Sequence, residues 1–535
     1  MSNPSSSTGP SRWTVLFISF VVALAPMLVW SVGSPLMSVP DEPSHAIRAA
    51  AVVRGQLGRT PFVEQPTQSA AVVPASIAAA HSLPCFAFHP EISAGCQVPL
   101  TTDPDRLVTT GTTAGLNSPV YYAVVGLPSL VVHGEAAFTA MRVLNSILCA
   151  ALLAVMFMQL CSLPAHRWAV ICAAAAITPM LLFLGGAINP NSVEAAAAGA
   201  LLATLLATFR SRSSPAQLWG RVMLVVVSTL FLVSGRSIGL LWVVLVVGTA
   251  LILSDRSVLR SVLVRPAAWV AVGASALIGA MTMVWFLDPP RFAAEPTASA
   301  ADPITWLFIA GVTLIRSIDY AAGLIGVFGW GETPMPPFTG AVWAAVVAAV
   351  LATAVFVATP FARRMLFGAI LVMLAVPPIV QASAYAEYGF IWQGRYLLAP
   401  FLCTIVLAGF AIDGSGRIGF RPGVRRLVLV AAAFLGVGQV LAFFTTMVRF
   451  VVGSTGTPLD LIAAPQWLPP IHWATLVAAL TTVMAAAWLA FVRLIDRADP
   501  ATDAVEAISS RAALQEHDGE ADPPSGGSRV PAPSL

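Results

Sequence analysis

The sequence predicts an all-α polytopic membrane protein with about twelve transmembrane helices. Of its 535 residues, 57% are hydrophobic and only 10% are charged, and the mean hydropathy is +0.83. A soluble domain carries about 25% charged residues, so this composition indicates a chain that lies mostly in lipid. Apolar runs of about 20 residues, enough to cross a bilayer, recur along the chain. We expect spans near residues 13–32, 136–160, 168–187, 191–209, 221–235, 238–254, 267–287, 340–360, 365–381, 396–412, 426–446 and 471–493.

The short loops between these runs predict the orientation. Arginine gathers in the loops AHRW, RSRSSPAQLWGR, SDRSVLRSVLVR, FARR and GSGRIGFRPGVRR. Short basic loops stay in the cytoplasm, and all five fall there if the N-terminus is also inside. This arrangement requires that residues 118–132 do not span, so we expect an interfacial helix there on the outer face. The two runs within 221–254 are the weakest part of the count, because SGRSIG interrupts them.

The chain is then expected to divide into three parts. Residues 1–12 form a cytoplasmic N-terminus, and residues 13–497 form the transmembrane domain. This domain carries long outer loops at 33–135 and 288–339. The polar residues 498–535 form a disordered cytoplasmic tail.

Two features of the outer loops stay open from sequence alone. Residues 306–330 are apolar enough for a thirteenth span, but Arg316 and Asp319 within them favour a re-entrant or interfacial helix. Cys85 and Cys96 lie eleven positions apart in a polar loop. They either form a disulfide, as is common outside the cytoplasm, or remain free thiols.

The segment VPDEPSH, residues 39–45, follows the first expected span and carries two adjacent acids and a histidine. Ionisable groups at a membrane boundary often mark functional sites. Asp41 at the N-cap and Pro43 in the first turn predict a helix that begins here. Asp41 and His45 would then share one face of that helix. A pure capping role could explain Asp41, but it explains Glu42 and His45 less well.

Other polar groups are expected on the same side of the membrane. They are Tyr122 in NSPVYY, Asn191 and Glu194 in NPNSVE, Glu332 in GWGETPMPP, and Gln393, Arg395 and Tyr396 in QGRYLLAP. The rigid donor fork of Arg395 suits phosphate, although an interfacial arginine can also simply snorkel. Tyr122 could be an aromatic anchor and Asn191 a helix cap. Glu194 lies about one turn inside an apolar helix, where a lone carboxylate is costly.

These residue types indicate a particular chemistry. The chain has no Walker motif or glycine-rich nucleotide loop, and its arginines are spread among short loops, so neither a nucleotide-driven reaction nor a nucleic-acid partner is expected. A carboxylate near a phosphate-binding arginine suits transfer of a sugar from a polyprenyl phosphate to an acceptor hydroxyl. The carboxylate takes the hydroxyl proton, and the cation offsets the charge on the departing phosphate.

The motifs PDEPSH, NSPVYY, NPNS, GWGETPMP and QGRYLLAP, in this order over residues 35–412, resemble the bacterial membrane-protein family called domain of unknown function 2142 (DUF2142). That family is similar to the GT-C glycosyltransferases, multi-span enzymes that use polyprenyl-phosphate sugars. The resemblance implies a catalytic acid in the first outer loop, matched by Asp41, and a following interfacial helix, matched by 118–132. Many such enzymes carry a second acid where this chain has NPNS. Asn191 cannot act as a base, which leaves Glu194 as a substitute and a divalent metal as an open question.

We therefore expect a GT-C-like glycosyltransferase of the bacterial plasma membrane with an extracytoplasmic active site. Asp41 would be the base, with Glu42 or His45 orienting it or the acceptor. Arg395 would bind the phosphate of a polyprenyl-phosphate sugar, helped by Gln393 and Tyr396. The acceptor would be a glycan, a lipid or a protein of the cell envelope. The alternatives are a transporter or flippase of lipid-linked glycans, which would need charged groups along the helix interiors, and a non-catalytic scaffold of an envelope-assembly complex.

Overall fold

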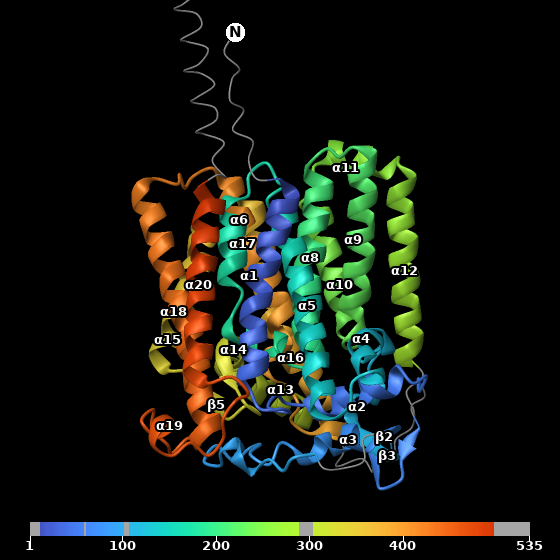
Figure 1. Ribbon diagram of the computed structural model, residues 1–535. Coiled ribbons are helices and arrows are strands. Elements are labelled where there is room, and N and C mark those ends of the chain that lie inside the picture. The colour runs from blue at the N-terminus through green and yellow to red at the C-terminus, as the bar shows by residue number, and fades with distance from the viewer. Residues whose placement is uncertain (1–10, 58–59, 101–105, 288–302, 497–535) are drawn as a thin grey trace, which may run out of the picture.

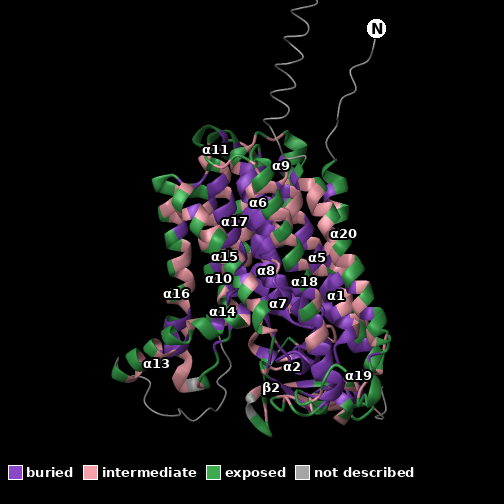
Figure 2. Ribbon diagram, turned by 90° about the vertical axis from the view of Figure 1, so that its left-hand side faces the viewer, coloured by how far each residue is buried: buried purple, intermediate pink, exposed green. Residues whose placement is uncertain are grey.

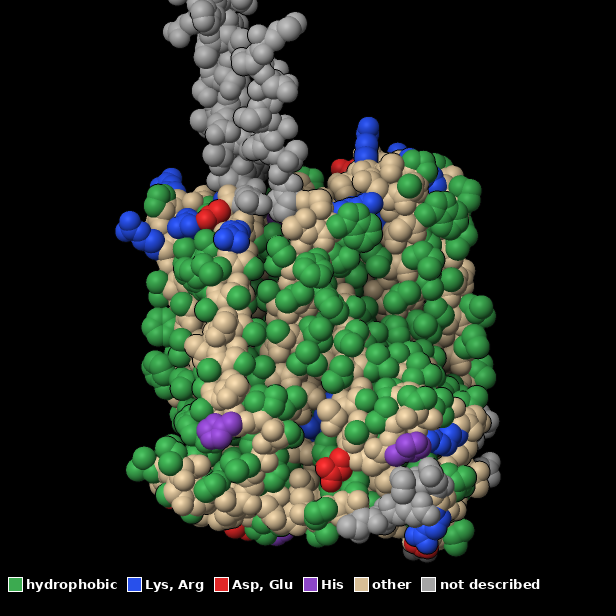
Figure 3. All heavy atoms as spheres, in the orientation of Figure 1, with side chains coloured by type: hydrophobic (Ala, Val, Ile, Leu, Met, Phe, Trp, Pro, Cys, Tyr) green, Lys and Arg blue, Asp and Glu red, His purple; other side chains and the backbone are tan. Residues whose placement is uncertain are grey.

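Long helices run between two ends of the molecule, and short helices and strands gather at one of these ends (Figure 1). The computed structural model describes residues 11–57, 60–100, 106–287 and 303–496. The expected tail at 498–535 and nearly all of the expected N-terminal segment 1–12 lie outside the described residues. We call the end that holds helix α2 and strands β2 and β3 the sheet end. Figure 3 shows arginine side chains gathered at the opposite end, which we call the arginine end.

Ten helices in the described part of the chain are long and apolar enough to cross a membrane. They are α1 (Arg12–Gly33), α5 (Gly134–Leu160), α8 (Pro190–Arg210), α9 (Pro215–Ser234), α12 (Pro266–Leu287), α15 (Pro337–Val357), α16 (Pro360–Tyr388), α17 (Leu398–Ser415), α18 (Pro422–Val452) and α20 (Trp473–Asp496). Three bent helix pairs bring the count to as many as 13 if each pair is one span. The expectation of an all-helical membrane protein with about twelve spans is confirmed.

The first bent pair, α6 (Arg167–Ala175) and α7 (Pro179–Gly185), turns by 69° within the expected span 168–187. The break has a local cause. Pro179 begins α7, and a residue that precedes proline avoids helical backbone. Thr178 accordingly has ψ 161°, and its side chain accepts a hydrogen bond from the N–H of Leu181. One expected straight span is therefore two short helices.

The second bent pair, α10 (Gly239–Ile252) and α11 (Arg256–Leu263), turns by 117°. With 14 residues, α10 is about 21 Å long and shorter than a bilayer core of about 30 Å. The weak run at 238–254 is thus a helix shorter than a spanning helix. The third pair, α13 (Pro303–Ile315) and α14 (Ser317–Gly326), bends by 49°. Both Figure 1 and Figure 2 place α13 at the sheet end, as an interfacial or re-entrant segment would lie.

The long loop after α1 folds into short elements at the sheet end. They are α2 (Glu42–Val52), β1 (Pro61–Phe62), β2 (Gln65–Pro74), α3 (Ala75–Ala78), η1 (Ala79–Ser82), η2 (Ala94–Cys96), β3 (Leu107–Thr112), η3 (Thr113–Leu116), α4 (Pro119–Val125) and η4 (Leu127–Leu130). As expected, 118–132 holds no spanning helix, because α4 has only seven residues. The strands, which we did not expect, pair antiparallel in the order β1-β2-β3. The sheet holds α2 in place, since the Thr112 hydroxyl donates to the carbonyl of Ser44 at 2.7 Å.

Helix α8 forms the centre of the bundle. The first 19 of its 21 residues, from Pro190 to Thr208, are buried, and Figure 2 shows this buried core along α8. Its many alanines allow α5, α9 and α17 to approach closely, as small residues do in membrane bundles. Because the helix is enclosed on all sides, polar residues at its sheet end face protein groups rather than lipid. The remaining described elements are β4 (Val327–Phe328), β5 (Thr333–Pro334), η5 (Gly394–Leu397) and α19 (Asp460–Ala463).

Candidate functional site

Asp41 occupies the N-cap position of α2 but does not cap it. Its backbone has φ 66° and ψ 0°, and its side chain makes no capping hydrogen bond. Aspartate tolerates this left-handed conformation better than most residues, at some cost in free energy. The carboxylate instead accepts a hydrogen bond from Arg395, with 2.6 Å between Oδ2 and Nη2. The side chain of Asp41 is 42% exposed and that of Arg395 only 4%. The carboxylate is therefore held by a buried cation while remaining open to a ligand.

Arg395 is positioned by the short helix η5, which lies against α14. A Cβ atom on Gly394 would overlap the carbonyl oxygen of Tyr320 and lie 2.8 Å from the backbone nitrogen of Leu324. Only glycine permits this approach, so Gly394 fixes the position of Arg395 relative to α14. The next residue, Tyr396, has its ring centroid 5.2 Å from Cζ of Arg395. Gln393 is exposed at the start of η5.

Arg236 is a further cation at the site, and the sequence analysis did not single it out. It comes from the SGRSIG turn between α9 and α10, and its Cζ lies 3.5 Å from the ring centroid of Tyr396. It also interacts electrostatically with Glu194 and Asp41. Two guanidinium groups thus contact one tyrosine ring beside Asp41. The sequence feature that could have indicated Arg236 is its place between two apolar runs, at the ends of the expected spans that face the outer side of the membrane.

The start of α8 joins this cluster. Asn189 is the N-cap, accepting from the N–H of Asn191 at 3.0 Å, and its Nδ2 donates to the carbonyl of Pro40 at 3.4 Å. The expected capping role therefore belongs to Asn189 rather than to Asn191. Glu194, one turn later, is 4% exposed, and a Cβ on Gly235 would lie 3.5 Å from its Oε2. Glu194 and Arg236 are consequently close neighbours.

His45 forms a buried hydrogen-bonded chain with α4. Its Nδ1 lies 2.9 Å from the hydroxyl of Tyr122, which accepts from Nδ2 of Asn117 at 2.8 Å. The single proton of the tyrosine is then free to donate to Nδ1, which leaves the proton of His45 on Nε2. Burial, aided by the charges of Arg236 and Arg395 and opposed by Asp41, lowers the pKa of His45 to about 3. His45 is therefore neutral near pH 7 and acts as a hydrogen-bond donor rather than a proton carrier. Burial also raises the pKa of Tyr122.

Glu42 faces away from Asp41 and anchors the fold. It is fully buried and forms two hydrogen bonds of 2.7 Å with Nε and Nη2 of Arg142. It also accepts from the N–H of Ile188 at 3.1 Å. The expectation that Glu42 orients the base or the acceptor is not supported by this geometry, because both carboxylate oxygens are already occupied. A bidentate pair of this kind fixes the position of α2 against α5.

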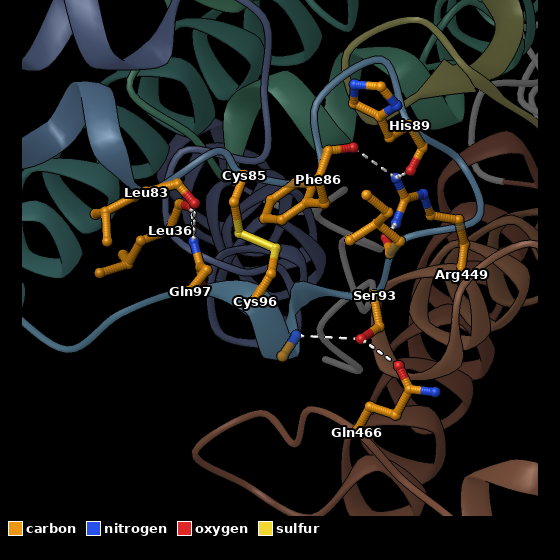
Figure 4. The surroundings of a disulfide bond; sticks show 12 residues. Leu36, Leu83, Cys85, Phe86, His89, Ser93, Cys96, Gln97, Arg449 and Gln466 are labelled. Atoms are coloured by element: carbon orange, nitrogen blue, oxygen red, sulfur yellow. Dashed lines mark hydrogen bonds between the residues drawn. A yellow bond between two sulfur atoms is a disulfide. The ribbon is translucent and has the colours of Figure 1, made fainter.

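A second structural cluster surrounds the Cys85–Cys96 disulfide and includes Arg449 (Figure 4). Glu332 joins this cluster through Arg449. Its carboxylate lies 3.3 Å from Nη2 of Arg449. Burial raises the pKa of Glu332, and the positive charge of Arg449 opposes that rise. Arg449 also donates to carbonyl groups of the disulfide loop, at 2.9 Å to Phe86, 3.0 Å to His89 and 2.6 Å to Ile92. Arg449 therefore holds this loop to α18, and Glu332 pairs with Arg449 rather than joining Asp41.

The residues around Asp41 do not fit a divalent metal. No group of three or more His, Cys, Asp or Glu side chains that could hold a metal ion occurs among the described residues. The nearest charged partners of Asp41 are arginines, which would repel a cation. The cluster instead combines cations with hydrogen-bond donors, which suits a ligand that carries a phosphate and hydroxyl groups.

Comparisons with known proteins give a family and a set of distant structures. The structure of ArnT from Cupriavidus metallidurans bound to undecaprenyl phosphate is 14% identical, with a TM-score of 0.42 over 91% of this chain and 77% of that chain. Its apo structure is also 14% identical, with a TM-score of 0.45 over 90% of this chain and 76% of that chain. The oligosaccharyltransferase AglB from Archaeoglobus fulgidus, in complex with an inhibitory peptide and a dolichol-phosphate, is 14% identical, with a TM-score of 0.40 over 84% of this chain and 57% of that chain.

No curated protein matches the sequence. The family model described as "Predicted membrane protein (DUF2142)" matches residues 24–405, more than half of the chain. This range includes Asp41, Arg236 and Arg395, the residues that meet at the sheet end. The protein therefore belongs to the DUF2142 family of membrane proteins.

Proposed function

We propose that this protein is a membrane glycosyltransferase that moves a sugar from a polyprenyl-phosphate donor to a hydroxyl of a cell-envelope acceptor. The observation that carries the proposal is the 2.6 Å contact between Asp41 and Arg395, which lie 354 positions apart. The exposed carboxylate can accept a proton, and the buried guanidinium can bind a phosphate. The reaction needs both groups at one reacting centre.

This geometry supports the following step. Oδ2 of Asp41 is held by Arg395, so Oδ1 accepts the proton of the acceptor hydroxyl. The acceptor oxygen forms a bond to the anomeric carbon of the sugar while the bond from that carbon to the phosphate oxygen breaks. The phosphate leaves with the bonding electron pair and remains on Arg395.

Neighbouring residues complete the proposed site. Arg236, which contacts the ring of Tyr396 from another element, adds a second cation for the phosphate. His45 donates from Nε2, which is buried and has no protein partner among the described residues, to a ligand oxygen. Tyr122 holds the ring of His45, and Gln393 lies exposed beside Arg395. Positioning of this kind contributes to the rate by holding the reacting groups in line.

The proposed setting is the bacterial plasma membrane, with both termini in the cytoplasm and the sheet end outside. The arginine-rich short loops support this orientation. Residues 13–497 would act as one membrane domain, with 498–535 as its cytoplasmic tail. The donor would enter from the lipid, and the acceptor, a glycan, lipid or protein, would approach the sheet end from the outer compartment.

The test is sugar transfer by purified protein in lipid vesicles, with a panel of radiolabelled polyprenyl-phosphate sugars and an envelope extract as acceptor. Asp41→Asn keeps the shape and removes the base, so transfer should fall by at least 100-fold. Arg236→Gln should weaken donor binding while the protein stays folded. Asp319→Asn is the matched control, because Asp319 is 69% exposed and pairs with Arg316 rather than with Arg395. Equal transfer by wild type and Asp41→Asn would refute the assignment of the base.

A further inference from the structure

Three buried polar side chains around Asp41 have atoms with no hydrogen-bond partner among the described residues. They are both amide atoms of Asn191, Nε2 of His45 and Nε of Arg395. Each residue is 3% to 4% exposed. Buried polar groups are normally paired, and leaving them unpaired costs free energy. Three such groups, on α2, α8 and η5, indicate a binding site for a polar ligand.

Asn191 is the member of this group to which the reaction assigns no role. It lies in the first turn of α8, whose N-cap Asn189 is tied to Pro40, the residue before Asp41. Asn191 and Glu194 are three positions apart and so share a face of α8. Glu194 on that face borders Gly235 and interacts with Arg236. Ser192 lies on a different face, toward α5, where its hydroxyl is 3.4 Å from Nδ2 of Asn145. Asn191 is thus on the Arg236 side of the helix.

We propose that Asn191 and Glu194 form the donor-sugar subsite and recognise a neutral sugar by its hydroxyl groups. This inference rests on the proposed function and extends it to the part of the donor that is transferred. An amide offers both a donor and an acceptor, which matches the hydroxyl groups of a sugar ring. Glu194 accepts from a hydroxyl, and because its charge is offset by the neighbouring Arg236, the subsite favours a neutral sugar over one that carries a charge. The first turn of α8 thereby sets which sugar enters.

The experiment compares the affinity of purified protein for a bare polyprenyl phosphate and for the same carrier bearing a neutral hexose, a uronic acid or an amino sugar. Wild type should bind the hexose donor more tightly than the bare carrier. Asn191→Leu should lower this preference by about tenfold, the effect of losing one or two hydrogen bonds, with the affinity for the bare carrier unchanged. Ser192→Ala is the matched control, since it alters the same turn on the face toward α5, and its preference should equal that of wild type.

The outcomes separate this inference from the proposed function. If wild type binds neither the bare carrier nor any donor, the proposed function fails. If wild type prefers the hexose donor and Asn191→Leu keeps that preference, the sugar subsite lies elsewhere and the inference fails alone. A preference of wild type for the uronic acid or the amino sugar would overturn the neutral class. Should Asn191→Leu not fold, Asn191→Asp keeps the size and the acceptor but loses the donor, and should show the same loss of preference.

Discussion

The ion pair between Glu42 and Arg142 provides a stability test that separates an anchoring acid from a catalytic one. Glu42→Gln keeps the shape and removes the charge, which leaves Arg142 as an uncompensated cation that is 1% exposed. Removing one partner of a buried ion pair costs about 3–5 kcal/mol of stability. Arg142 also donates to the carbonyls of Ser31, Ser34 and Pro35. We therefore expect about 3 kcal/mol for Glu42→Gln, because those contacts and one side-chain oxygen remain.

The assay is thermal and denaturant unfolding of the detergent-solubilised protein, followed by tryptophan fluorescence. Arg142→Met should cost more than Glu42→Gln, since it also leaves three buried carbonyls unpaired. The double variant should be at least as stable as Arg142→Met alone, because Arg142→Met leaves Glu42 as a buried carboxylate without its cation and the second change removes that charge. Glu135→Gln, at an exposed position in the first turn of α5, is the control and should unfold like wild type. Full stability of Glu42→Gln would refute the anchoring role. If that stable protein also lost transfer, Glu42 would instead belong to the reaction.

Three further predictions concern the sheet end. The lowered pKa of His45, about 3, means that the unfolded chain takes up a proton below pH 6.5 while the folded one does not. Unfolding at pH 7 and pH 5 should therefore show wild type losing about 2 kcal/mol more than His45→Gln, and equal losses would contradict the burial of His45. Gly394→Ala should displace η5, because its Cβ would overlap the carbonyl of Tyr320; donor binding should fall, and unchanged binding would count against the placement of η5. Replacing Cys85 and Cys96 by serine should cost about 3 kcal/mol for a loop of this length, whereas free thiols in the native protein, detected by alkylation and mass spectrometry, would contradict the disulfide.

Much of the fold followed from the sequence because a bilayer constrains it strongly. Spans need long apolar runs, and lipid leaves no other partner for their backbone groups. The positions of α1, α5 and α8 were therefore predictable from hydropathy alone. The short helix α4 was also predictable, since counting it as a span would have placed five basic loops on the wrong side. The break between α6 and α7 was missed, although Pro179 marked it.

Part of the candidate site also followed from the sequence. The motif that contains Asp41 and the motif that contains Arg395 both lie where an expected span meets the outer side, so their convergence could be expected. Arg236 was missed because an arginine between two apolar runs is equally typical of a simple loop. The pairing of Glu332 with Arg449 was missed because Arg449 lies near the end of the apolar helix α18 and gives no signal of its own.

The sequence by itself determined that the chain is a helical membrane protein with acids, arginines and amides gathered toward one end. Only the tertiary structure decided which of two adjacent carboxylates is open to a ligand. Glu42 meets Arg142, 100 positions away, and is fully buried, whereas Asp41 meets Arg395, 354 positions away, and stays 42% exposed. Asp41 has left-handed backbone before the helix, whereas Glu42 is the first residue of α2, so the two side chains take different directions. Their partners come from different helices, so helix packing, rather than local sequence, assigns one acid to the fold and the other to the site.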